Sequence, residues 1–191
     1  GLALLPLLTG MPLLLGPIHI AFIEMIIDPV CSLAFEAETE ERNVMERPPR
    51  APDTPIFSRW LVGWSVIQGA LVLLATAGLT LWFWHSGVGA DVLRCAAFFA
   101  LVFGILSLIL LNRTFSASMI AAIRRPNIAL GIVIAIVTTI LSVTQFSPAV
   151  AGLFRFEAVA VRDLALIVAV GIAVMFTLES LKPLWGKRLL A

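Results

Sequence analysis

The sequence lacks tyrosine and has few charged residues: Asp, Glu, Lys and Arg make up 13% of the 191 residues, against 60% hydrophobic residues. This composition leaves too little polar surface for a water-soluble domain of this length, and the mean hydropathy of +1.04 agrees. The net charge of +1 gives no indication of a nucleic-acid partner. We therefore expect an all-α fold, a polytopic helix bundle in a lipid bilayer, and divide the chain into membrane-spanning helices and not into soluble domains.

Cysteine is also scarce, since the chain has only Cys31 and Cys95, both in apolar surroundings and without metal-ligand spacing. Such lone cysteines are typical of small buried hydrophobic residues. The sequence has no basic segment ahead of its first apolar run and no initiating Met, so we expect no cleavable signal peptide. We interpret it as a piece of a longer chain.

Hydrophobic runs and their interruptions divide the chain. Residues 1–16 carry Pro6, Gly10, Pro12 and Gly16, which predicts the end of one helix followed by a tight connection. The acidic and then proline-rich segment 36–59 predicts an extended loop in water. Four tryptophans predict interface anchors at both ends of the helix after that loop: Trp60, Trp64, Trp82 and Trp84. The predicted membrane helices are residues 17–35, 60–85, 95–111, 128–146 and 164–181.

The orientation follows from Lys and Arg, which favour the cytoplasmic side of membrane proteins. Loop 36–59, loop 112–127 and the C-terminal tail together hold ten of the thirteen basic residues. These two loops and the C-terminus are therefore predicted to be cytoplasmic.

Two acids interrupt the apolar run 17–35. Glu24 and Asp28 are four residues apart, hence on one helix face, and acids at membrane depth by default indicate an ion or proton path. Pro29 has no N–H, which leaves the Met25 carbonyl free between them. Carboxylate and carbonyl oxygens suit calcium or magnesium, so we predict a metal site formed by Glu24, Asp28 and the Met25 carbonyl.

These groups provide too few ligands alone, so helices outside this chain should complete the shell. Two acids this close should also not both be ionised without metal, which makes proton counter-transport a hypothesis. Alternatively, both acids pair with basic or hydroxyl groups on other helices.

The other polar residues have simpler interpretations. Glu179 is predicted to pair with Lys182, and Gln68 and Asn112 to form hydrogen bonds between helices. Gln145 is predicted to face lipid headgroups. His19 and His85 are isolated near helix ends, which argues against metal ligation.

A longer pattern resembles a known family. Asp28, followed at a fixed distance by Met45-Glu46-Arg47-Pro48-Pro49-Arg50, is similar to the sixth membrane helix and next loop of cation-transporting P-type ATPases of the calcium-pump branch. Weaker similarities cover most of the remaining chain: Leu8 to Pro12 with Gly16-Pro17, Leu111-Asn112-Arg113 with Ser116, Arg125-Pro126-Asn127, and Glu179 to Lys182.

The resemblance implies the C-terminal part of an ion pump's membrane domain. Its partners would be the remaining helices and cytoplasmic domains of the parent ATPase, which would use ATP and magnesium. The family's phosphorylated D-K-T-G motif does not occur here, so the chain has no predicted catalytic residue and cannot hydrolyse ATP alone.

The sequence also departs from the family pattern. Glu24 stands where the calcium pumps carry Asn, Pro29 replaces Gly, and Leu106 stands where the two-calcium branch carries a Glu ligand. Calcium is the first expectation, with magnesium, manganese, sodium and protons open. The missing tyrosine and abundant Ala, Leu and Arg suggest a bacterial plasma membrane. The competing interpretation is a free-standing small carrier or assembly subunit without an ATPase, although a carrier should show repeat symmetry.

Overall fold

The computed structural model describes residues 1–37, 58–113 and 127–189, except for the side chains of residues 26–31, 33–35, 184 and 186–189. Over these ranges it holds a short 3-10 helix, Leu2–Leu4, and seven α-helices. The α-helices are α1 (Leu5–Thr9), α2 (Pro17–Glu36), α3 (Arg59–His85), α4 (Ala90–Asn112), α6 (Ile128–Phe146), α7 (Pro148–Phe154) and α8 (Val161–Leu189). The predicted all-α class is confirmed.

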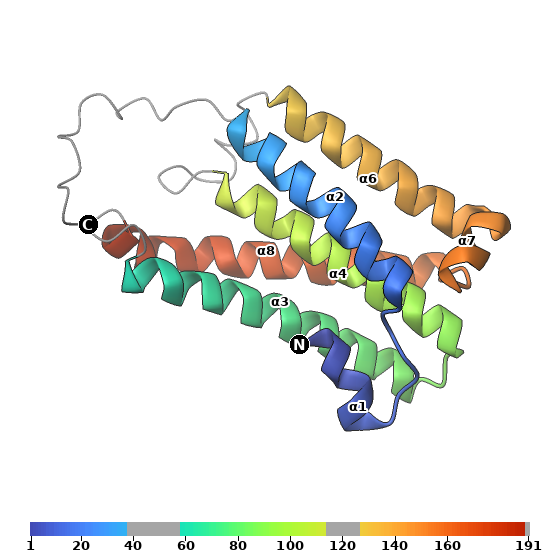
Figure 1. The fold of residues 1–191 in the computed structure, drawn as a ribbon. Coiled ribbons are helices and arrows are strands. Elements are labelled where there is room, and N and C mark those ends of the chain that lie inside the picture. The colour runs from blue at the N-terminus through green and yellow to red at the C-terminus, as the bar shows by residue number, and fades with distance from the viewer. Residues whose placement is uncertain (38–57, 114–126, 190–191) are drawn as a thin grey trace.

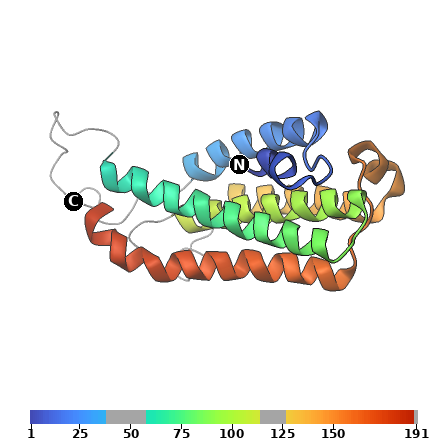
Figure 2. The same ribbon diagram turned by 90° about the horizontal axis from the view of Figure 1, so that it is seen from below.

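The long helices run side by side (Figures 1 and 2). In the described part of the chain, four are long and apolar enough to cross a membrane: Arg59–His85, Ala90–Asn112, Ile128–Phe146 and Val161–Pro183. They match four of the five predicted crossings, and α2 remains the predicted fifth.

Local signals set several helix ends. The Ser58 hydroxyl accepts a hydrogen bond from the Leu61 N–H at 3.1 Å, and Asn127 caps α6 by accepting from the Leu130 N–H at 2.9 Å. Both are side-chain caps for N–H groups that have no partner within the helix. α1 ends at Gly10, whose φ of 71° is left-handed and suits a residue without Cβ.

α4 is the central helix, since it contacts α3, α8 and α2, while α6 contacts α2 and α7. One end of the bundle, here named the α7 end, holds α7, the turn at residues 86–89 and the connection at 10–16 (Figure 1). The main core lies there and includes Leu93, Phe98 and Phe99 of α4. A smaller cluster at the other end joins α3, α4 and α8, with Trp64, Leu111 and Leu178 at its centre.

The structure corrects two sequence predictions here. Trp64 was expected at the interface, but it is 1% exposed because it packs within the cluster of α3, α4 and α8, with its ring centroid 5.9 Å from that of Trp185. Residues 147–163, which lie between the predicted helices 128–146 and 164–181 and were expected to form a loop, contain α7, a helix of seven residues. Trp60 and Trp82 are 44% and 48% exposed, as interface anchors require.

Candidate functional site

α2 presents two different faces. Its inner face carries His19, Phe22 and Ile23; His19 is buried, and Phe22 and Ile23 pack against the main core. On the outer face Glu24 is exposed, and so is its neighbour Met25, with 76% of its surface accessible. The Glu24 carboxylate therefore points away from the bundle formed by this chain.

The predicted partner of Glu24 lies one turn further along the same helix. Asp28 is within α2, which continues through Pro29 to Glu36, and four residues advance a helix by about 6 Å. The Asp28 side chain lies outside the described part, so its proximity to Glu24 stays a prediction. Pro29 cannot donate to the Met25 carbonyl, because it has no N–H.

Completion of a metal site needs further ligands. Within the described residues, no three His, Cys, Asp or Glu side chains are grouped so that they could hold a metal ion. Glu24 faces outward, so additional ligands would have to come from outside the bundle described here.

A second polar cluster joins α3, α4 and α8 at the end opposite α7. Gln68 and Asn112, each predicted to form hydrogen bonds between helices, exchange two amide hydrogen bonds of 3.0 and 2.9 Å with one another. The predicted Glu179–Lys182 pair is also present at 3.4 Å. The sequence did not reveal that the Lys182 ammonium also donates to the Leu111 carbonyl at 2.9 Å and lies buried between the helices.

The α7 end holds polar contacts that the sequence did not predict. The Arg94 guanidinium donates to the carbonyls of Leu13 at 3.2 Å and Arg155 at 2.7 Å. The prediction that Gln145 faces headgroups was wrong: it is buried and donates to the Val159 carbonyl at 2.6 Å. Each of these acceptors is a backbone carbonyl, which explains why no residue pattern indicated it.

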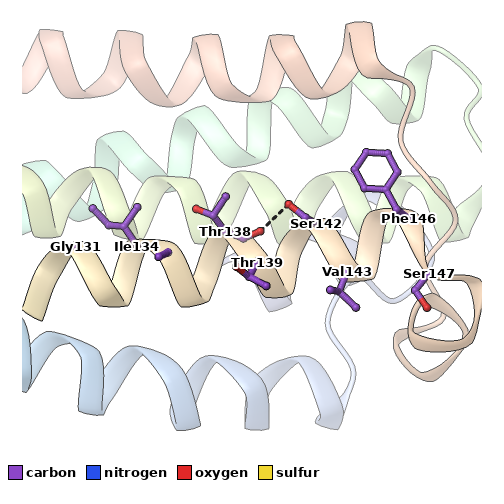
Figure 3. Close-up of a pocket in the computed structure, with 9 residues that line it drawn as sticks. Gly131, Ile134, Thr138, Thr139, Ser142, Val143, Phe146 and Ser147 are labelled. Carbon is purple, nitrogen blue, oxygen red and sulfur yellow. Dashed lines mark hydrogen bonds between the residues drawn. The ribbon is translucent and has the colours of Figure 1, made fainter.

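A groove of about 760 Å³ runs along α6 (Figure 3). It is lined by small, hydroxyl and apolar residues, among them Gly131, Thr138, Thr139 and Ser142, and none of its described lining residues is charged. The Ser142 hydroxyl donates to the Thr138 carbonyl at 2.8 Å. The groove therefore offers no charged group for an ion and does not compete with α2 as a cation site.

The amino-acid sequence is similar to those of known ion-transporting ATPases. The family described as "Cation transporting ATPase, C-terminus" matches residues 12–184. The "Probable cation-transporting ATPase F" of Mycobacterium tuberculosis is 32% identical over 98 residues, which are 51% of this chain and 11% of that protein. The "Calcium-transporting ATPase" of Bacillus subtilis is 36% identical over 74 residues, 38% of this chain and 8% of the relative.

The "Probable calcium-transporting ATPase" of Trypanosoma brucei brucei is 31% identical over 86 residues, 41% of this chain and 8% of that protein. The matched regions thus span about a tenth of the length of these relatives. Because the family match covers most of the chain and the structure supplies its long apolar helices, the chain belongs to the C-terminal membrane domain of the cation-transporting P-type ATPases.

Proposed function

We propose that the chain forms the C-terminal part of the membrane domain of an ATP-driven pump and contributes Glu24, Asp28 and the Met25 carbonyl to its intramembrane cation site. The remaining ligands come from helices elsewhere in the parent protein. The parent's cytoplasmic domains supply phosphorylation by ATP, and the resulting movement of helices exposes the site to alternate sides.

The observation that carries this proposal is the outward position of Glu24 on α2. A carboxylate on an apolar helix cannot face lipid without a large free-energy cost. Burial inside this chain does not relieve that cost, because the side chain is exposed in the described structure. A cation held between α2 and helices of the parent pump would neutralise the Glu24 carboxylate and remove this cost.

Calcium is the proposed cargo, with magnesium, manganese, sodium and protons as alternatives to be tested. The B. subtilis and T. brucei relatives are both named calcium-transporting ATPases. Carboxylate and carbonyl oxygens are the ligands that calcium prefers. Counter-transport of protons would follow if the emptied acids take up protons.

The distribution of Lys and Arg supports a topology in which loops 36–59 and 112–127 and the C-terminus are cytoplasmic. The α7 end is then extracytoplasmic. The Tyr-free, Ala- and Leu-rich composition supports a bacterial plasma membrane.

The test is calcium-stimulated ATP hydrolysis by the full-length protein, reconstituted in vesicles and measured against free calcium. Glu24→Gln and Asp28→Asn should each raise the calcium concentration for half-maximal activity at least about tenfold, or about 1.4 kcal/mol. Glu36→Gln is the matched control, because Glu36 is exposed at the last residue of the same helix. It should change this concentration less than about twofold.

Normal calcium affinity in both Glu24→Gln and Asp28→Asn would rule out the assigned site. Repeating the titration with magnesium, manganese and sodium identifies the cargo as the cation whose half-maximal concentration these variants change.

A further inference from the structure

The imidazole of His19, in the first turn of α2, connects that helix to the end of α7. His19 is 3% exposed. The Gly16 N–H donates to its Nδ1 at 2.9 Å, and its Nε2 lies 3.0 Å from the Phe154 carbonyl. Its ring centroid lies 5.0 to 5.8 Å from those of Phe98, Phe154 and Phe156. Gly16, His19 and Phe154 are named the His19 latch below.

The two backbone partners determine the protonation state of the ring. An amide N–H can only donate and a carbonyl can only accept, so Nδ1 must carry a lone pair and Nε2 the proton. This is the neutral imidazole in one tautomer. A second proton would go to Nδ1, where it would face the Gly16 N–H and break that hydrogen bond.

The charges around the ring add to this effect. The ionisable residues on the elements packed against His19 are Asp91, Arg94 and Cys95 of α4, Arg155 and Glu157 after α7, and Glu24, Asp28, Cys31 and Glu36 on α2 itself. Asp91 already pairs with Arg94 at 2.6 Å. Among the described contacts of His19, no carboxylate is bonded to the ring. An imidazolium would lose the bond from Gly16 and keep the one to the Phe154 carbonyl, but its charge would be buried beside Arg94. Moving the ring into water, away from Phe154, relieves the cost of that buried charge.

The segment that His19 contacts is itself held firmly. Arg94 donates to the Arg155 carbonyl at 2.7 Å, and Gln145 donates to the Val159 carbonyl at 2.6 Å. The Phe154 carbonyl thus belongs to a part of the molecule fixed to α4 and α6. His19 lies five residues before Glu24, about 7.5 Å along the helix.

From this geometry we infer that His19 is a positioning residue for the cation site: neutral, it fixes the α7 end of α2, and an extracytoplasmic proton releases that end and lowers cation affinity. This inference rests on the proposed function for the cation site and for the side of the membrane on which the α7 end lies. Histidine is the side chain suited to such a change between pH 5 and 8.

Two amide substitutions separate the two hydrogen bonds of the latch. In His19→Gln the side-chain nitrogen can replace Nε2 and keep the bond to Phe154, without titrating. In His19→Asn the side-chain oxygen can replace Nδ1 and keep only the bond to Gly16. His19→Gln is therefore the conservative variant, and His19→Asn the variant that detaches α2 from α7.

The first measurement uses the full-length protein in vesicles, with the pH varied on the α7 side and the calcium affinity determined at each pH. Between about pH 7.5 and pH 5.5, the unsubstituted protein should lose calcium affinity about fivefold, the lower end of ordinary coupling between sites. His19→Gln should keep the neutral-pH affinity and lose most of this pH dependence. His19→Asn should have the weakened affinity at both pH values.

The second measurement needs no transport. Nitroxide labels at Ile20→Cys in α2 and Leu153→Cys in α7, both exposed positions, report their separation by pulsed electron paramagnetic resonance. The distance distribution should broaden at acid pH in the protein with His19 and stay narrow in the protein with His19→Gln.

Unchanged distributions between the two pH values, or equal broadening with His19→Gln, would overturn the latch. Equal pH dependence of calcium affinity in both proteins would also overturn it. Broadening that depends on His19, together with normal calcium affinity in Glu24→Gln and Asp28→Asn, would support the latch and reject the proposed cation site.

Discussion

α2 and α8 carry similar local sequences with different outcomes. Each has a glutamate within an apolar helix and a proline that leaves one carbonyl without its helical hydrogen bond, Met25 in α2 and Glu179 in α8. In α8 the Glu179 carboxylate meets the Lys182 ammonium at 3.4 Å inside the bundle. In α2 Glu24 faces outward. The comparison separates an acid that the chain itself neutralises from one that it leaves exposed, and only the second is a candidate for the proposed cation site.

The largest expected effect comes from removing the cation of the ion pair in α8. Lys182→Met should lower the free energy of unfolding by about 3 kcal/mol, because it removes the cation beside the partly buried Glu179 carboxylate and the donor to the Leu111 carbonyl. Glu24→Gln should change it by less than about 0.5 kcal/mol. The measurement is SDS-induced unfolding of the protein in mixed micelles. Equal losses in the two variants would remove the distinction between the helices.

A smaller effect tests how closely the α3, α4 and α8 side is packed. A Cβ on Gly104 of α4 would lie 2.6 Å from Val72 Cγ1 of α3, so the helices must separate. Gly104→Ala should therefore cost about 1–3 kcal/mol in the same assay. Gly78→Ala is the control, since a Cβ there meets nothing within 4 Å. If Val72→Ala does not restore stability to Gly104→Ala, the close approach is not the cause.

The smallest expected effect concerns the amide pair between α3 and α4. Gln68→Leu, Asn112→Leu and the double variant form a thermodynamic cycle for the bonds of 3.0 and 2.9 Å. Their coupling energy should be about 0.6 kcal/mol and at most about 1.7 kcal/mol, as for other hydrogen bonds between membrane helices. A coupling energy of zero would mean that water or lipid satisfies the amides equally well.

Much of the fold could be predicted from the sequence, because membrane helices leave a strong signal in apolar runs. The predicted helix 128–146 agrees with α6, whose boundaries are set by Asn127 and by Pro148, which begins α7. The missed α7 also had a signal, since Ser147-Pro148 is a typical helix start. Seven residues are too few to give a hydrophobic period that could be distinguished from a loop.

The candidate sites could be predicted only where both partners are side chains of suitable type. The pair Glu179 with Lys182 was predicted because its two charges are three residues apart on one helix. Gln68 and Asn112 were each predicted to bond between helices, and the fold determines that they bond to each other. His19, Arg94 and Gln145 instead bond to backbone carbonyls, which every residue has. Only the fold determines which carbonyl lies near, so no pattern of residues could have identified these contacts.

The His19 latch also has a consequence for biosynthesis. His19 and Phe154 are 135 residues apart. At a synthesis rate of about 5–20 residues per second, α2 exists for roughly 7 to 27 s before its partner carbonyl has been made. During that interval α2 has no anchor from α7, and the carboxylate of Glu24 is already in the chain. The bond that ties the start of this helix to α7 therefore forms only late in translation, after α2 and its other neighbours α4 and α6 are already in the chain.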